Sequence, residues 1–269
     1  MNLNPSLPPG WLQPAWPAPG WVGALFATRA GGVSEEPWGS LNAGGQAGDV
    51  PGSVRANRER LALALGARPV FLRQVHGARV IELGPESVDG AQADGAVTQS
   101  LGIACTVQVA DCLPVLLAHR QARVVAAAHA GWRGLAAGVL ERTFERFWEL
   151  ARRQENPANR FMPGGTLAWL GPAIGPRRFE VGGEVRAAFL AGDAQAAGCF
   201  HTLPGGKFLA DLPALARRRL ARMGITHVYG NDGGDGWCTM SDAARFHSYR
   251  RDQARLGGAG RMTACIWLQ

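Results

Sequence analysis

Two apolar segments of the sequence contain side chains that can hold a metal ion, or act as a nucleophile and its base. Cys112 lies in VADCLPVLLA (109–118), and His129 lies in AAAHAGWRGL (126–135). His76 ends the apolar run of RQVHG at a glycine, as His129 does in its own segment. Strand ends meet at one rim of a sheet, where such side chains converge. A thiolate with two imidazoles is a ligand set typical of catalytic zinc, with a fourth position open.

The same residues also allow two interpretations without a metal, because the spacing of the three is not diagnostic. Cys112 can be a buried free cysteine beside structural histidines, or a nucleophile with a histidine as its base. Asp111, directly before Cys112, is expected either to orient a ligand or move a proton, or only to cap the turn. The other histidines are expected to be solvated or structurally bonded: His119, His201, His227 and His247.

Two further segments are candidates for contacting a substrate. GWRG leads into a helix predicted over residues 135–153, so its main-chain N–H groups would face an anion. Arg133 could add a bidentate, charge-assisted hydrogen bond to the same anion. A tight turn with an exposed arginine is the alternative. The glycine-rich loop after a predicted strand at 22–28 contains Arg29 and Asn42. It is either a binding loop or a plain connection.

The elements that must position these residues are mostly short strands. Apolar segments follow one another closely between residues 69 and 130: PVFLRQVH, RVIEL, GAVTQ, GIACTVQVA, LPVLLAH and RVVAAAHA. They leave no room for helical crossovers, which favours a mixed or antiparallel sheet. We therefore expect one α+β domain over residues 1–269, with residues 1–21 wrapping over its surface.

Besides a helical segment that begins in FEVGGEVRAAFLAG (179–192), three segments have the periodicity of helices. One begins near Asp49, a candidate N-cap, and ends at Gly66. The helix at 135–153 places an apolar stripe on one face: Leu140, Phe144, Phe147 and Leu150. A third has Asp211 as its candidate N-cap and ends at Gly224.

Composition limits the classes of protein to consider. Of 269 residues, 46% are apolar, yet no apolar run is long enough to span a membrane, and the five cysteines show no C-x-x-C spacing. We expect a cytoplasmic protein with free thiols and no membrane partner. The net charge of +7 suggests a polyanion-binding module as an alternative, but the basic residues are scattered and no stripe of aromatic and basic residues is present. We therefore expect no nucleic-acid partner.

The sequence resembles the YfiH family, also called the laccase-domain or polyphenol oxidase family, from residue 22 to 268. The motifs that carry this resemblance occur in the family's order: TRAGGVS, SLNAGG…GD, NRERL, QVHG, ADCLPVLL, HAGWRG, GPAIGPRRFEVG and FHSYRRD…GRM. ADC-x-P upstream of HAGWRG is the most specific of them. The resemblance implies a layered α/β/β/α sandwich with mixed sheets, and a zinc site at His76, Cys112 and His129.

The same resemblance implies an enzyme that cleaves purine nucleosides with phosphate. Adenosine, inosine, guanosine and methylthioadenosine are the expected nucleosides, with adenosine deamination as a second activity. Apart from the resemblance, we expect a monomer or homodimer. Two rival activities come with the family: hydrolysis of an amide in peptidoglycan precursors, and copper-dependent oxidation of phenols. Six histidines without an H-x-H pair cannot supply several copper sites, although copper stays possible as the single metal. No role is assigned to residues 230–262.

Overall fold

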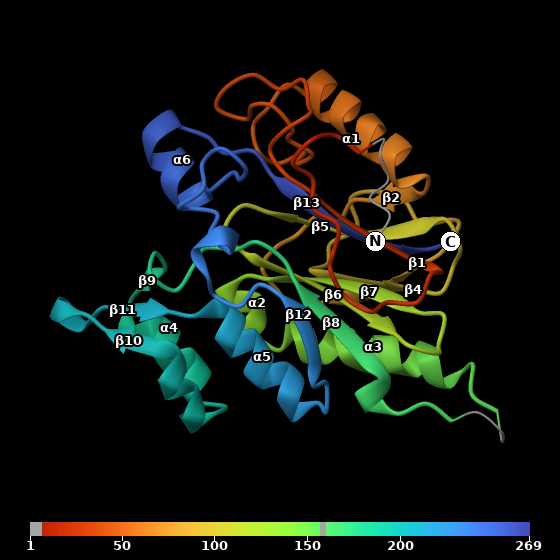
Figure 1. Cartoon of the computed structure of the whole chain (residues 1–269). Helices are drawn as coiled ribbons and strands as arrows, with labels where there is room; N and C mark the ends of the chain where they lie inside the picture. The colour runs from red at the N-terminus through yellow and green to blue at the C-terminus, as the bar shows by residue number, and fades with distance from the viewer. Residues whose placement is uncertain (1–6, 157–159) are drawn as a thin grey trace.

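The computed structural model describes residues 7–156 and 160–269. Two β-sheets lie face to face at its centre, and helices cover both outer faces (Figure 1). This arrangement confirms the expected α/β/β/α sandwich with mixed sheets. The chain's described part contains no helix that is both long and apolar enough to cross a membrane.

The first sheet brings the two ends of the chain together. Its order is β1-β13-β5-β2, with the bounds Val22–Ala27, Met262–Leu268, Ile103–Val109 and Arg68–Val70. Strand β13 pairs antiparallel with both β1 and β5, whereas β2 is parallel to β5. Helix α1 (Pro51–Leu65) covers the outer face, where Leu61 and Leu65 pack in one apolar cluster with Leu25 and Trp267.

The second sheet carries most of the strands predicted from the middle of the sequence. Its order is β12-β8-β6-β7-β4-β3, with the bounds His227–Gly230, Thr166–Leu170, Leu113–His119, Val125–Ala130, Gly95–Thr98 and Val80–Leu83. Parallel pairs at both edges flank antiparallel pairs in the centre. Helices α3 (Val139–Arg152) and α5 (Leu212–Arg222) pack on its outer face.

Apolar side chains from both sheets fill the space between them. Phe26, Val107 and Ile266 of the first sheet share a cluster with Leu116 and Val125 of the second, and each is buried. At about 25 cal/mol per Å² of apolar surface removed from water, this burial is the main force that holds the two sheets together. The loops at the strand ends are therefore attached to a rigid frame.

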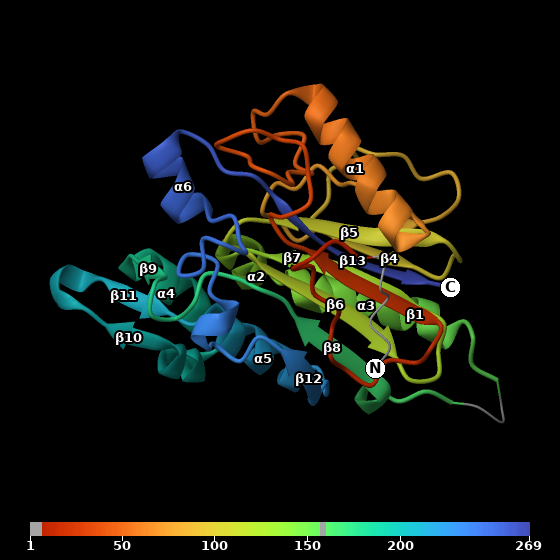
Figure 2. The ribbon, with the colours of Figure 1, turned by 45° about the horizontal axis from the view of Figure 1, so that its top comes forward.

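Smaller elements gather at one end of the sandwich (Figure 2). A three-stranded sheet has the order β10-β11-β9, with the bounds Phe200–Thr202, Phe208–Ala210 and Glu180–Val181. The helices of this region are α2 (Trp132–Ala136), α4 (Gly183–Leu190) and α6 (Tyr249–Leu256). Short 3-10 turns lie at Pro163–Gly165, Ala194–Cys199, Pro204–Gly206 and Asp235–Trp237.

Some local predictions differ from the structure. The helix expected over 135–153 is divided into α2 and α3 by Gly138, whose φ of 90° is in the left-handed region. Asp49 is not the N-cap of α1, because Val50 holds that position and Asp49 instead accepts hydrogen bonds from Ser34 and Asn42. Asp211 does cap α5, by accepting a hydrogen bond from the Ala214 N–H.

The N-terminal segment lies against the first sheet where it is described. Residues 1–6 of the segment expected to wrap the surface are outside the described residues. Beyond them, Leu12 forms an isolated antiparallel bridge with Phe26, and Trp11 is buried in the cluster under α1. This part of the segment thus contributes apolar contacts to the core.

Candidate metal centre and its cavity

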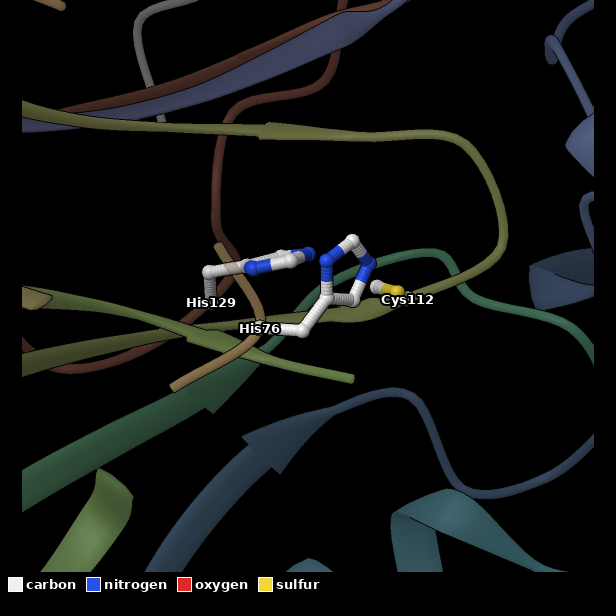
Figure 3. Close-up of side chains that lie close together, drawn as sticks. All are labelled: His76, Cys112 and His129. Carbon is white, nitrogen blue, oxygen red and sulfur yellow. The ribbon is translucent and has the colours of Figure 1, made fainter. Parts of the chain in front are cut away.

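His76, Cys112 and His129 come together from three separate segments (Figure 3). Cys112 occupies the turn between β5 and β6, His129 lies within β7, and His76 lies in the loop after β2. One ligand atom from each lies within 4.8 Å of the other two, and the centroids of the two imidazole rings are 4.8 Å apart. The convergence expected from the sequence is therefore present in the structure.

The position of His76 differs from the sequence-based expectation. Strand β2 ends at Val70, so His76 does not end a strand and instead has a φ of 61° in a turn. The buried carboxylate of Asp94 holds this turn by accepting hydrogen bonds from the backbone N–H groups of Val75, His76 and Gly77, at 3.1, 2.9 and 2.8 Å. These three bonds compensate for the unusual backbone conformation.

Asp94 also orients His129. The sequence analysis did not identify Asp94 as a residue of the site. Its Oδ1 lies 2.8 Å from His129 Nδ1, which leaves Nε2 of that ring for a ligand. Burial alone would raise the pKa of Asp94, but the hydrogen bond from His129 and those from the backbone outweigh it, so this pKa is lowered. The available signal was an acidic residue at the entry to the buried strand β4, in QADGAV.

The electrostatics of the site favour a thiolate at Cys112. Burial raises the pKa of the thiol, but the facing imidazoles of His129 and His76 outweigh it and lower this pKa to about 6. The same interactions with Cys112 and Asp94 overcome burial at His129 and raise its pKa to about 9. A cysteine must be deprotonated to bind a metal, so the lowered pKa of Cys112 favours binding, whereas His129 must give up a proton to become a ligand at neutral pH.

Metal-free protein is expected to show this thiolate directly. Alkylation of Cys112 by iodoacetamide should rise through about pH 6 and level off above it, because only the thiolate reacts. Cys105 and Cys265, whose pKa values are raised by burial, should stay unmodified in the folded protein. Peptide mass spectrometry across pH 4–10 measures both, and an alkylation midpoint near that of an ordinary thiol would contradict the assignment.

Two glycines explain the HAGWRG motif in physical terms. A Cβ at Gly131 would lie 2.7 Å from Cys112 Sγ and 3.1 Å from His76 Cδ2, and both distances are shorter than a van der Waals contact. A Cβ at Gly134 would lie 2.7 Å from the backbone oxygen of Gly77, in the turn that carries His76. Both positions therefore keep the three ligands close together.

Gly131→Ala is expected to lower metal affinity about 10- to 100-fold, the range typical for disturbing the groups that place a ligand. The added methyl group must displace either Cys112 or His76. Gly52→Ala in α1 is the matched control, because a Cβ there meets no atom within 4 Å. Competition with a chromogenic chelator measures the affinities, and equal values for the two variants would contradict the packing argument.

The three ligands line a cavity of about 560 Å³, to which α2 and α6 also contribute residues. Apolar groups line one part of it, including Trp132, Ile174 and Phe179, and polar groups line the rest. The volume is in the range of pockets that bind small organic molecules. Further lining residues are Gly44, Gln46, Ala47, Gln74, Gln108, Ala110, Asp111, Arg133, Tyr249, Arg250 and Arg261.

The structure distributes the candidate substrate contacts unevenly. Arg133 lines the cavity, exposed and with its guanidinium 4.3 Å from the centroid of the Trp132 ring. Arg29 and Asn42 are not among the lining residues. The Arg29 guanidinium donates to the backbone oxygens of Gly39 and Ala243. Through these hydrogen bonds, Arg29 supports the backbone of the loop after β1.

Asp111 lines the cavity and ties two segments together. Its Oδ1 accepts a hydrogen bond from Thr239 Oγ1 at 2.6 Å, and its Oδ2 accepts one from the Arg250 N–H at 2.7 Å. Asp111 has a φ of 89°, in the left-handed region. These bonds fix the turn that carries Cys112 against the start of α6.

Comparison with known proteins identifies the family. The model of the family described as multi-copper polyphenol oxidoreductase laccase matches residues 23–269. The chain belongs to this laccase-domain family. Among curated relatives, the purine nucleoside phosphorylase YfiH of Escherichia coli is 49% identical over 259 residues, 96% of this chain and 98% of the relative. This match confirms the resemblance to YfiH.

Other proteins are similar to this chain in sequence and in structure. A purine nucleoside phosphorylase of Pseudomonas aeruginosa is 48% identical over 261 residues, 96% of this chain and 98% of its own. The crystal structure of NMB0706 from Neisseria meningitidis has a TM-score of 0.85 at 42% identity, covering 97% and 99% of the two chains. YlmD from Geobacillus stearothermophilus has a TM-score of 0.84 at 29% identity, covering 97% and 96%. The fold is thus shared along nearly the whole chain.

Proposed function

We propose that this chain is a zinc-dependent purine nucleoside phosphorylase that acts on adenosine, inosine, guanosine and methylthioadenosine, and that it also deaminates adenosine. The observation that carries the proposal is the group of three ligand atoms within 4.8 Å of one another, lining a cavity of about 560 Å³. Two relatives of nearly equal length that are named purine nucleoside phosphorylases support the reaction class.

The donor set fits Zn²⁺ better than other common metals. A thiolate and two imidazoles suit a borderline metal ion, and three protein ligands leave the fourth tetrahedral position free for catalysis. His129 has the carboxylate partner that metal-ligating histidines usually have, since Asp94 binds its Nδ1. His76, Cys112 and His129 would therefore hold the ion, and Asp94 would orient two of them.

In phosphorolysis, a phosphate oxygen forms a bond to ribose C1′ while the bond from C1′ to the purine nitrogen breaks. The purine leaves with the electron pair and takes up a proton, and the products are the free base and ribose 1-phosphate. A bound zinc ion supplies positive charge as a Lewis acid. The lining arginines bind and orient the anionic phosphate, and the apolar groups around Phe179 exclude water from the base.

Deamination of adenosine would use the same cavity with water in place of phosphate. Water adds to C6 of the purine and ammonia leaves, so inosine forms without an oxidant or reductant. The pocket that binds the adenine base for one reaction presents it for the other. Asp111 borders the cavity beside Cys112, but both of its carboxylate oxygens are already hydrogen-bonded, so we propose that it caps this turn and does not move a proton.

The rival activities fit the structure less well. Multicopper oxidation needs several metal sites, whereas the described residues contain one group of three or more clustered ligands. Hydrolysis of an amide at the same centre is the remaining enzymatic rival, because a zinc site can serve either reaction. A polyanion-binding module does not account for a buried carboxylate that positions two clustered histidines.

The test combines metal content with products. Protein purified without added metal is expected to contain about one zinc per chain, to release adenine from adenosine only when phosphate is present, and to form inosine from adenosine. Inductively coupled plasma mass spectrometry and liquid chromatography measure these. Zinc without purine turnover would contradict the phosphorylase and favour amide hydrolysis, while protein that never retains zinc would contradict the metal site.

A further inference from the structure

The cavity is lined by more positive than negative charge. Arg133, Arg250 and Arg261 line it, and Asp111 is the one acidic residue among its described lining residues. Both oxygens of Asp111 are already engaged by Thr239 and the Arg250 N–H. An anion with more than one negative charge therefore complements this cavity.

The three arginines differ in how free they are to bind such an anion. The Arg133 guanidinium is exposed beside the Trp132 ring, and that of Arg250 is also exposed and donates to the Glu180 backbone oxygen at 3.1 Å. Arg261 is half-buried, directly before β13. Its Nη1 donates to the Ala259 and Gly260 oxygens, at 2.7 and 3.3 Å, while its Nε and Nη2 have no hydrogen-bond partner among the described residues.

No carboxylate of the described residues forms an ion pair with Arg261. The partly buried Arg251 of α6 shows the usual alternative, since its guanidinium pairs with the Asp252 carboxylate at 2.7 Å. Burial lowers the pKa of Arg261, and the negative charges of Cys112 and Asp111 offset part of this effect. A partly buried cation without a paired carboxylate is costly unless a ligand supplies the opposite charge.

A buried polar network fixes Arg261 in place. The side-chain oxygen of the fully buried Asn42 accepts hydrogen bonds from the N–H groups of Arg261 and Gly44, both at 2.9 Å. Asn42 Nδ2 donates to Asp49, and the Asn42 backbone oxygen accepts from Asn57. Asn42, expected to contact substrate, thereby holds the backbone of a residue that faces the cavity.

Gly44 leaves the space that the Arg261 side chain occupies. A Cβ at Gly44 would lie 2.5 Å from Arg261 Cγ and 2.9 Å from its Cβ. The Arg261 guanidinium also lies 5.5 Å from the centroid of the Tyr249 ring, at the start of α6. The loop after β1, the start of α6 and the residues before β13 thus hold the Arg261 guanidinium in place, with its Nε and Nη2 groups free to donate.

We propose that Arg261 is the principal phosphate-binding residue of this cavity, in place of Arg133, and that Asn42 and Gly44 position it. The identity of the anion rests on the proposed function, in which phosphate is a substrate. The same subsite would hold free phosphate in the forward direction and the phosphate of the pentose 1-phosphate in the reverse direction. A guanidinium suits both of these phosphate groups, because two of its N–H groups can donate to two phosphate oxygens at once.

The test measures binding of inorganic phosphate to zinc-loaded protein by isothermal titration calorimetry, beside the KM values for phosphate and nucleoside. Arg261→Met keeps an unbranched, flexible side chain and removes the guanidinium with its charge. It is expected to weaken phosphate binding about 10- to 100-fold, as for loss of a charge-assisted hydrogen bond. Nucleoside KM should change less than about threefold and zinc content should stay at one per chain.

Further variants separate loss of the phosphate contact from a general loss of folding stability. Arg261→Lys should recover part of the phosphate affinity, and Gly44→Ala should lower it without removing any charge. Arg142→Met, which removes an exposed arginine of α3 outside the cavity, should behave as the unmodified protein. Melting temperatures confirm that each variant is folded.

The outcomes separate this inference from the proposed reaction. Unchanged phosphate binding in Arg261→Met, or a loss confined to Arg133→Met, would overturn the assignment. Phosphate binding that depends on Arg261 in a protein without phosphorolysis would support the subsite while the proposed function fails. Phosphorolysis with an unchanged KM for phosphate in Arg261→Met would support the function and overturn the subsite.

Discussion

Cys112→Ala is expected to remove the bound metal and to lower kcat/KM about a thousandfold or more. The thiolate is the charged member of the ligand set, and two imidazoles alone hold a borderline metal weakly. A bound metal ion stabilises charge in a transition state by several kcal/mol, and each 1.4 kcal/mol is a factor of ten. Metal analysis and the purine-release assay on one preparation measure both losses.

A second cysteine provides the matched control for this experiment. Cys199 is buried at the end of the 3-10 turn at Ala194–Cys199 and does not line the cavity. Cys199→Ala should keep both zinc and activity, with a modest fall in melting temperature from the lost packing. The comparison separates loss of the ligand from the general effect of removing a buried thiol.

The histidines test whether Cys112 is a ligand or a nucleophile. If it is a ligand, His76→Ala and His129→Ala should lose metal and activity together, since each removes one of three donors. If it is the nucleophile of a metal-free enzyme, Cys112→Ala would lose activity while the unmodified protein is active without zinc. Full activity in the presence of a strong chelator would therefore contradict the metal centre.

Local patterns in the sequence predict the elements around the site well. Apolar runs predicted the strands from β3 to β7, and in β4 to β7 nearly every side chain is buried. Capping chemistry located α5 through Asp211, whose carboxylate acts on its own helix. Asp49 has the same chemistry, yet the contacts with Ser34 and Asn42 engage its side chain instead.

The residues that sequence reasoning missed depend on contacts between distant segments. Asp94 faces His129 because β4 pairs antiparallel with β7, and a sequence alone does not give that register. Arg261 faces the cavity because Asn42, more than 200 residues earlier, binds its N–H. The motifs did indicate His76, Cys112 and His129, but the turn that holds His76 depends on the carboxylate of Asp94.

Asp94→Asn is expected to lower metal affinity about 10- to 100-fold, the usual range for a carboxylate behind a ligand. Oδ1 of Asp94 accepts from His129 Nδ1 and from the His76 N–H, and Oδ2 accepts from the N–H groups of Val75 and Gly77. An asparagine has one acceptor oxygen, so it cannot serve both pairs. Either His129 loses its partner or the turn that carries His76 loosens.

The pH dependence of this variant distinguishes an electrostatic role from a purely structural one. Asp94 helps to raise the pKa of His129 to about 9, so at neutral pH the metal must displace a proton from that ring. Removing the carboxylate lowers the pKa of His129, and the pH at which metal affinity is half maximal should shift downward while the maximal affinity falls. Chelator competition from pH 5 to 9 measures both quantities.

Asp193→Asn is the control variant, because it removes a carboxylate that is paired with Arg218 outside the cavity. It should change neither the maximal metal affinity nor the pH midpoint. A lower affinity with an unshifted midpoint would mean that Asp94 acts on the metal centre through the backbone turn alone.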